Sequence, residues 1–340
     1  MQIGLNFVFN GDFIVSAKLS QDILLNALTE FKNANGNISE AARRLGISRT
    51  TFQHWINEAR KNKIIGESSQ LKILGYEQPS YATRFPIDIE NGMVVIFSDA
   101  HFWPGIISTA NLALIKFLKE FSKDIKAIIC NGDALDGASI SRHSPLAWEE
   151  RPTLIQEIET CTDRLHEIIE ACPKALRIWP IGNHDARFEA RLALQAPEYA
   201  NIHGMHLKDH FPLWENAMSC WINDDIVVKH RYKGGIHATH NNVVNAGKTI
   251  ITGHLHSLKV MPFTTYSEFH DSWPITKFGV DTGTLADPFG KQFRYSEDNP
   301  LNHRSGFVVL TFNKGRLAWP EIVHVVEGGV VEFRGQFWNV

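Results

Sequence analysis

The feature that most constrains the fold of this chain is a set of five short apolar runs that are each followed by polar, metal-binding types of side chain. The runs are MVVIF, IKAIIC, ALRIWPI, DIVVK and KTIIT. Each has the length and the β-branched composition of a buried strand. In open α/β sheets, functional groups cluster just past the carboxyl ends of such strands. The pattern therefore predicts an α/β domain with its reactive groups on one rim.

The polar residues after the five runs are acids, amides and imidazoles. In chain order they are Asp99 and His101, then Asp133 and Asp136, then Asn183, His184, Asp185 and Arg187, then His230, and finally His254 and His256. His254 and His256 lie two positions apart, so an extended strand would aim both rings to one side. A single such motif is weak evidence, but five in succession favour a metal site over scattered surface groups.

Helices are expected between the first strands, over residues 108–123 and 153–170, because apolar residues recur there at helical spacing. The order is βαβαβ, which is typical of a layered sheet with a strong parallel component. From about residue 226 onward strands dominate. We expect them to form a second, more antiparallel sheet packed on the first, giving a β-sandwich flanked by helices.

Residues 21–63 have a different character and predict a small all-α domain. Asn37 and Glu40 resemble a capping box, Gly46 ends that helix, and Ser48 can cap the next. The segment resembles a helix-turn-helix of the bacterial Fis type. The alternative is a helical hairpin used only for packing.

If the segment binds DNA, its second motif helix enters the major groove. The whole segment, residues 21–63, carries seven Lys and Arg against four Asp and Glu, which is a net charge of +3 in a chain of net charge −3. The basic surface is therefore local and mild. The outward residues expected to contact DNA are Arg49, Thr50, Gln53, His54 and Asn57.

The expected domain organisation has four parts. Residues 1–20 form an N-terminal arm, 21–63 the helix-turn-helix domain, 64–92 a linker, and 93–340 the α/β domain. Apolar runs are far shorter than the roughly 18 residues of a membrane span, no secretory signal is visible, and the four cysteines have no metal-like spacing. We expect a soluble, cytoplasmic protein with no membrane partner. Self-association stays open.

The motifs D-x-H, G-D-x-x-D, G-N-H-D, a strand-end His and G-H-x-H together resemble the signature of the calcineurin-like metallophosphoesterases. The resemblance covers about residues 93–285. The stretch LDGASISRH is similar to the phage and prophage branches of that superfamily. The resemblance implies a layered metallophosphoesterase β-sandwich and a phosphoester substrate.

The resemblance also implies a role for each residue. Asp99, His101, Asp133 and His256 would hold one metal, and Asp133, Asn183, His230 and His254 the other, with Asp133 bridging. A metal-bridging hydroxide would be the nucleophile. His184 would be the general acid, with Asp185 orienting it. Mixed carboxylate, imidazole and amide ligands independently suit two divalent ions, with Mn expected and Fe, Zn or Ni as alternatives.

Sequence context points to further residues of the site. His230 follows an apolar strand, which favours it as the ligand over His237 and His240. Arg142 and His143, in the loop after the bridging Asp, and Arg187 are candidates to hold a substrate phosphate. The alternative for Arg142 and His143 is an ordinary surface loop.

The function expected from the sequence is a phosphodiesterase or nuclease that acts on or near DNA. One alternative is a phosphoesterase for a small-molecule or protein phosphoester, with the helical N-terminus used for partner docking. Another is a DNA-binding regulator whose phosphoesterase domain is a non-catalytic scaffold. Intact ligand motifs argue against the second alternative.

Overall fold

The computed structural model describes residues 21–34, 37–61, 79–145, 148–266, 273–296 and 302–340. The expected arm at 1–20 and most of the expected linker lie outside these ranges. The chain divides into two compact units, residues 1–78 and 79–340. Each is described by itself.

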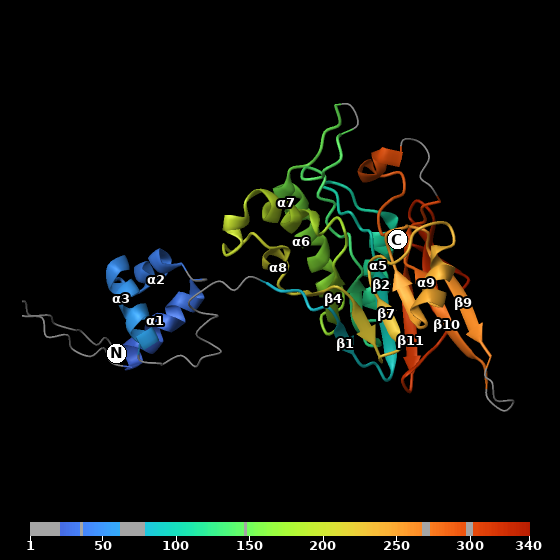
Figure 1. Ribbon diagram of the computed structural model, residues 1–340, viewed down its shortest axis with the longest axis horizontal. Helices are drawn as coiled ribbons and strands as arrows, with labels where there is room; N and C mark the ends of the chain where they lie inside the picture. Colours follow the sequence, from blue (N-terminus) through green and yellow to red (C-terminus); the bar gives the residue numbers. More distant parts are fainter. Residues whose placement is uncertain (1–20, 35–36, 62–78, 146–147, 267–272, 297–301) are drawn as a thin grey trace, which may run out of the picture. The chain divides into compact units, whose positions relative to one another are not determined.

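The first unit is a three-helix cluster made of α1 (Gln21–Asn33), α2 (Ile38–Arg44) and α3 (Arg49–Lys61) (Figure 1). Asn37 caps α2 by accepting a hydrogen bond from the backbone N–H of Glu40 at 3.1 Å. Ser48 caps α3 in the same way through the N–H of Thr51. Phe31, Phe52 and Ile56 form part of the apolar core where the helices cross.

The second unit contains two sheets packed face to face. The nine-stranded sheet has the order β15-β14-β13-β11-β2-β3-β4-β5, with β12 paired to β11, and the six-stranded sheet has the order β1-β6-β7-β8-β10-β9. The strands of the larger sheet are β2 (Gly92–Phe97), β3 (Ile125–Cys130), β4 (Leu176–Pro180), β5 (Glu215–Ala217), β11 (Gly306–Asn313), β12 (Arg316–Leu317), β13 (Glu321–Glu327), β14 (Val330–Phe333) and β15 (Gln336–Asn339). Those of the smaller sheet are β1 (Phe85–Ile87), β6 (Cys220–Ile222), β7 (Ile226–Val228), β8 (Thr249–Thr252), β9 (Lys259–Thr265) and β10 (Ile275–Asp281).

Helices cover the outer faces of this sandwich. They are α5 (Thr109–Glu120), α6 (Leu154–Ala171), α7 (Arg187–Gln195), α8 (Leu207–His210) and α9 (Ala238–Ala246), with 3₁₀ turns η1 (Pro197–Tyr199) and η2 (Lys291–Ser296). The strand β2 shows why MVVIF is apolar throughout. Val94 and Ile96 pack between the sheets, whereas Val95 and Phe97 pack against the helical layer. The predicted fold class, a helix-flanked β-sandwich with a small all-α N-terminal region, is confirmed.

Two details differ from the sequence-based expectation. Residues 85–87, inside the expected linker, form β1 and pair in parallel with β6. Residues 238–246, in the part where strands were expected, form α9, which packs on β8, β9 and β10 through residues such as Val243 and Phe263. All four cysteines are buried free thiols. No helix in the described part of the chain has the length and apolarity to cross a bilayer.

Candidate metal centre

The candidate site lies where the carboxyl ends of strands from both sheets meet. β2, β3 and β4 are parallel neighbours in the larger sheet, and β7 and β8 are parallel neighbours in the smaller one. Asp99 follows β2, and its Oδ1 lies 3.0 Å from Nε2 of His256, which follows β8. Asp133 follows β3, and its Oδ2 lies 3.0 Å from Nε2 of His230, which follows β7. The carboxylates thus come from one sheet and their imidazole partners from the other.

Three groups of side chains have ligand atoms close enough to share a metal ion. The groups are Asp99 with His101 and His256, His101 with Asp133 and His184, and Asp133 with His230 and His254. Oδ1 of Asn183 lies 3.2 Å from Nε2 of His230. The structure therefore brings together all seven residues predicted as ligands, and Asp133 is shared between two groups. His184, predicted to face the substrate, is itself a member of one of the three groups.

Hydrogen bonds behind the site orient two of the imidazoles. Nδ1 of His101 lies 2.9 Å from Oδ1 of Asp136, and Nδ1 of His230 donates to the carbonyl of Asn131 at 2.8 Å. Both rings therefore turn Nε2 toward the carboxylates. The buried Nε2 of His101 has no hydrogen-bond partner in the described part of the chain. An unpartnered buried acceptor among carboxylates and imidazoles fits a divalent cation of the Mn, Fe or Zn type.

The electrostatics of the site also fit a cation. Burial raises the pKa of Asp99, but the charges of His256 and His230 outweigh burial, and that pKa falls to about 2. Burial likewise opposes ionisation of Asp133, yet His230 holds the pKa of Asp133 well below its ordinary value. Burial lowers the pKa of His230, but the negative charges of Asp133 and Asp99 outweigh burial and raise that pKa to about 10. Two buried carboxylates thus stay ionised close together, and positive charge beside them, supplied by protonated imidazoles or by a bound cation, compensates them.

Backbone strain is concentrated at the same positions. Non-glycine residues seldom adopt positive φ, and such residues gather at functional sites. Five of the seven predicted ligands do so, namely Asp99 (φ 51°), His101 (39°), Asp133 (56°), His254 (71°) and His256 (56°). The positive φ values therefore fall on residues that follow the ends of β2, β3 and β8.

A glycine beneath the site permits this close packing. A Cβ atom on Gly182 would lie 2.0 Å from Oδ1 of Asp133 and 2.4 Å from its backbone nitrogen. Gly253 has the same function beside Asp99, where a Cβ would lie 2.7 Å from Oδ2. Only glycine fits where the backbone passes this close to a carboxylate.

The environment of His184 corrects one prediction. Asp185 was expected to orient His184, but Nδ1 of His184 instead lies 3.0 Å from Oδ1 of Asp136 and 2.9 Å from the Asp136 carbonyl. Burial lowers the pKa of His184, but the hydrogen bond to Asp136 and the negative charges of Asp133 and Asp136 together outweigh burial, so the pKa is raised. Nη2 of Arg187 lies 3.0 Å from Nε2 of His184.

Asp185 has a supporting position below the site. Its carboxylate accepts hydrogen bonds from the backbone N–H groups of Asp133, Gly182 and Leu135, at 2.7, 2.9 and 3.1 Å, and from the indole N–H of Trp179 at 2.9 Å. It therefore ties the loop after β3 to the loop after β4. The reason for the difference from the prediction is that its side chain points into the core, away from the rim.

A pocket of about 500 Å³ adjoins the candidate metal centre. His143 and Arg187, two of the three predicted substrate-binding residues, line it together with His184 and Asn183. Arg142 is exposed on the same loop and is not among the lining residues. The structure thus places two of the three beside the metal centre.

Sequence reasoning missed a wall of this site. Residues from η2 and the segment after it reach the centre. The ring of Phe293 lies 5.3 Å from that of His101 and 5.0 Å from that of His256, and the ring of His303 lies 4.4 Å from that of His256. These residues follow no apolar strand and belong to no motif, so the sequence carried no signal for them.

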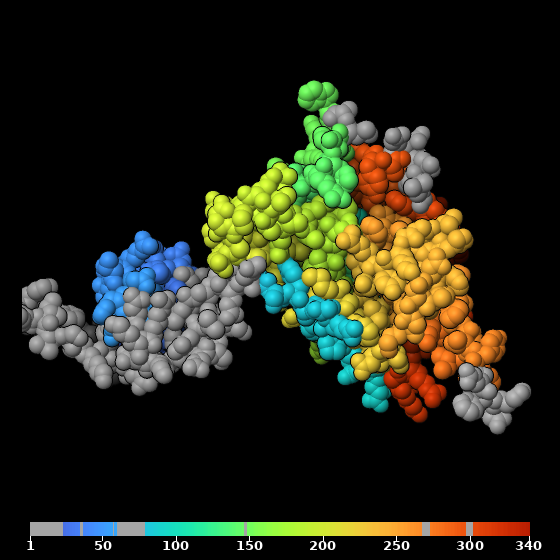
Figure 2. Space-filling model, in the orientation of Figure 1, coloured from blue at the N-terminus to red at the C-terminus, as the bar shows by residue number. Residues whose placement is uncertain are grey.

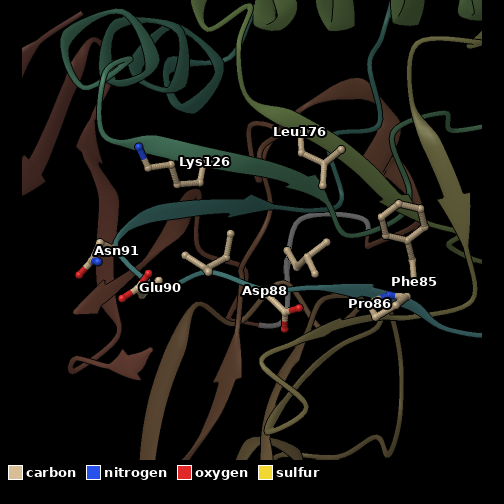
Figure 3. Close-up of a pocket in the computed structure, with 9 residues that line it drawn as sticks. Phe85, Pro86, Asp88, Glu90, Asn91, Lys126 and Leu176 are labelled. Atoms are coloured by element: carbon tan, nitrogen blue, oxygen red, sulfur yellow. The ribbon is translucent and has the colours of Figure 1, made fainter. Parts of the chain in front are cut away.

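A second pocket lies at the opposite ends of the strands. Figure 3 shows Lys126, at the start of β3, and Leu176, at the start of β4, above the strand that carries Phe85 and Pro86. None of the three groups with metal-ligand spacing includes a residue of this pocket. The chemistry of the described residues is therefore concentrated at the other edge.

In the N-terminal unit, the predicted DNA contacts lie on α3. Arg49, Thr50 and His54 are exposed, and Gln53 is half-buried. The side chain of Asn57 lies outside the described set. Arg43 and Arg44 both pair with Glu40, at 2.8 and 3.0 Å.

Comparison with known proteins bears mainly on this unit. Residues 17–54 match the model of the Fis family of bacterial regulatory proteins, so the N-terminal region is a Fis-type helix-turn-helix. No curated protein matches the sequence significantly. Among solved structures, the chain is similar to a conserved uncharacterized protein, a predicted phosphoesterase, from Streptococcus pneumoniae TIGR4. The identity is 10%, the match covers 74% of this chain and 99% of that one, and the TM-score is 0.28.

Proposed function

We propose that this protein is a binuclear-metal-dependent phosphoester hydrolase, and more specifically a phosphodiesterase or nuclease that acts on or near DNA. The observation that carries the proposal is the position of Asp133. Its carboxylate is buried, ionised and shared between two groups of potential ligands. A carboxylate between two divalent ions is the arrangement that two-metal hydrolysis requires.

In this proposal one ion is held by Asp99, His101, Asp133 and His256, and the other by Asp133, Asn183, His230 and His254. Bound divalent ions supply a water acidified toward neutral pH and neutralise charge on phosphoryl oxygens. Mn is the expected ion, with Fe, Zn or Ni as alternatives, because the ligands are carboxylates, imidazoles and an amide.

The chain itself supplies the proton for the leaving group. Nδ1 of His184 is held by Asp136, so Nε2 is the atom that faces the pocket. In the structure, Nη2 of Arg187 lies 3.0 Å from this Nε2 atom and donates a hydrogen bond to it. When a substrate phosphate draws the Arg187 guanidinium away, Nε2 can take up a proton from solvent, which gives an imidazolium whose Nδ1–H stays on Asp136. That Nε2–H would then protonate the departing oxygen, and the ring returns to its neutral form. His143, which lines the same pocket, would contact the phosphate.

The helix-turn-helix supports the proposal that the enzyme acts on DNA or on a substrate close to DNA. Such a motif places its second helix in the major groove, and α3 exposes Arg49, Thr50 and His54. In a cytoplasmic protein, a helix-turn-helix bound to DNA would bring the phosphoesterase domain of the same chain to the DNA. Two other functions give different results in the experiment below. They are hydrolysis of a small or protein phosphoester with the helices as a docking module, and DNA-dependent regulation by a chain without catalysis.

The test is hydrolysis by the purified full-length chain, supplied with Mn, of bis(p-nitrophenyl) phosphate, p-nitrophenyl phosphate, single-stranded DNA and duplex DNA. We expect both the chromogenic diester and DNA to be cleaved, and Asp133→Asn and His184→Ala to lower kcat by at least roughly 100-fold. Absence of hydrolysis of every substrate with every metal would leave the regulatory function. Cleavage of the chromogenic esters without DNA would favour the small-substrate function.

The role of the helix-turn-helix has its own test. We expect the affinity of the chain for duplex DNA to fall with rising salt, because phosphate contacts release counterions. Arg49→Ala should weaken binding, and a change of an exposed cation in the other unit, Lys123→Ala, should not. An affinity that does not depend on salt would remove phosphate contacts from the proposal.

A further inference from the structure

The pocket beside the metal centre is formed by chain segments that are distant in sequence. One wall is the loop of residues 138–145 and 148–151, and the other is η2. Figure 2 shows the loop (green) and η2 (orange-red) projecting beside each other from one end of the unit. Asn183 and His184 line the side toward the metals. A volume of about 500 Å³ lies within the range of roughly 300–1,000 Å³ that is usual for small-ligand sites.

The loop wall has an ordered base. Arg151 donates hydrogen bonds to the carbonyls of Ala138 at 3.1 Å and His143 at 3.2 Å, and its Nε lies 3.2 Å from Glu149. The buried carboxylate of Glu157 accepts the N–H groups of Gly137 and Ala138. These contacts hold both ends of the loop, so the pocket is built into the fold.

The charges that line the pocket favour an anion beyond the one at the metals. Of the acids there, Asp136 is engaged by His101 and His184, and Glu149 by Arg151. Lys291 is exposed at the rim and forms no ion pair with an acid of the described residues. A phosphomonoester would place its only phosphate at the metals and leave this cation without a partner. A substrate with a second phosphate would contact both the metals and Lys291.

An exposed aromatic ring lines the same pocket as that cation. Tyr295 is 66% exposed and lines the pocket from η2, four residues after Lys291. The buried Trp103 also lines the pocket. Aromatic rings interleaved with cations are the elements with which proteins hold single-stranded nucleic acid, since every base has a face for stacking.

We infer that this pocket binds the nucleotide next to the scissile phosphate in single-stranded DNA. The base stacks on Tyr295, and Lys291 contacts the adjoining phosphate. The inference rests on the proposed function, because it places the scissile phosphate at the metals. A paired base in a duplex is stacked between its neighbours and enters such a pocket only after it is flipped out. Single strands are therefore the preferred substrate.

The kinetic test compares two diesters in the full-length, Mn-loaded protein. They are a single-stranded 20-mer and bis(p-nitrophenyl) phosphate, which has no second phosphate. We expect Lys291→Ala and Tyr295→Ala to lower the ratio of kcat/KM for DNA to kcat/KM for the small diester by at least roughly tenfold, and Tyr295→Phe to retain it. The matched controls are Lys126→Ala, in the pocket of Figure 3, and Tyr266→Ala, after β9; they should leave the ratio unchanged.

A binding test gives a readout that does not depend on turnover. A trinucleotide with a central 2-aminopurine is too short for the major-groove helix, and its fluorescence is quenched by stacking. In a His184→Ala background, Tyr295→Ala should abolish the quenching and Tyr295→Phe should keep it.

The outcomes separate the two levels of the proposal. If the wild-type protein cleaves the small diester but the ratio does not change in either variant, the pocket assignment is overturned alone. A twofold or greater preference for duplex over single-stranded DNA overturns it as well. If the wild-type protein cleaves neither substrate, the proposed function fails, and an unquenched trinucleotide would then overturn the pocket assignment independently.

Discussion

Nδ1 of His184 lies 3.0 Å from Oδ1 of Asp136, and the same carboxylate oxygen lies 2.9 Å from Nδ1 of His101. One buried acid therefore orients both a predicted metal ligand and the predicted general acid. Neither imidazole can rotate without losing this contact. The relationship couples the metal centre to the group that would protonate the leaving oxygen.

The first prediction concerns this shared acid. Asp136→Asn should lower kcat/KM for bis(p-nitrophenyl) phosphate by about 10- to 100-fold, because the carboxylate that orients and polarises both rings is lost. Asp163→Asn, an exposed acid on α6, is the matched control and should have no effect. Steady-state kinetics with saturating Mn measures both variants. Wild-type kinetics for Asp136→Asn would show that the contact is dispensable.

The second prediction concerns the pair that follows β8. His254 belongs to the group with Asp133 and His230, and His256 to the group with Asp99 and His101. His254→Ala and His256→Ala should each leave one tightly bound ion per chain where the wild type has two, and the double variant should retain neither. Elemental analysis after dialysis counts the ions. If both single variants lose the whole metal content, or neither loses any, the two histidines do not serve separate ions.

The third prediction uses the close approach beneath Asp133. In Gly182→Ala the new Cβ would lie 2.0 Å from Oδ1 of Asp133, so that carboxylate must move. We expect metal content and activity to fall at least tenfold, with a lower unfolding temperature. Gly234→Ala is the matched control, because no heavy atom lies within 4 Å of its Cβ. Retention of both metals by Gly182→Ala would show that the Asp133 position tolerates displacement.

The elements that the sequence predicted well are those encoded locally. A buried strand followed by a polar residue is readable within about ten positions, as with MVVIF before Asp99. The parallel order of the strands then brings such ends together, which is why all seven predicted ligands meet. Asn37 as the cap of α2 is likewise a local signal.

What the sequence did not reveal depends on contacts between distant segments. Asp136 and Asp185 both stand near His184, and only the folded loops decide which carboxylate reaches the ring. The strand β1 exists because β6, more than a hundred residues later, offers it a partner. The η2 wall with Tyr295 has no periodicity or motif, so its approach to the metal centre appears only in three dimensions.

The fourth prediction is a pH dependence of stability that originates at Glu157. This side chain is fully buried and accepts the N–H groups of Gly137 and Ala138, at the base of the pocket loop. Burial, and after it the charge of Asp136, raises the pKa of Glu157 from 4.5 to about 7. The folded chain thus binds a proton that the unfolded chain has released. The stability linked to this proton is fully present below about pH 4.5 and is lost as pH rises through about 7.

The variant Glu157→Gln keeps an uncharged side chain of the same shape and does not titrate. Its lost or altered hydrogen bonds cost the same free energy at every pH, so only the difference from wild type carries the signal. Between pH 5 and pH 8 the wild type should lose roughly 1–3 kcal/mol of unfolding free energy relative to Glu157→Gln. Urea unfolding followed by tryptophan fluorescence measures this, with Glu159→Gln, an exposed glutamate of α6, as control. A difference that stays constant over this range would mean that Glu157 is already ionised in the folded protein at pH 5.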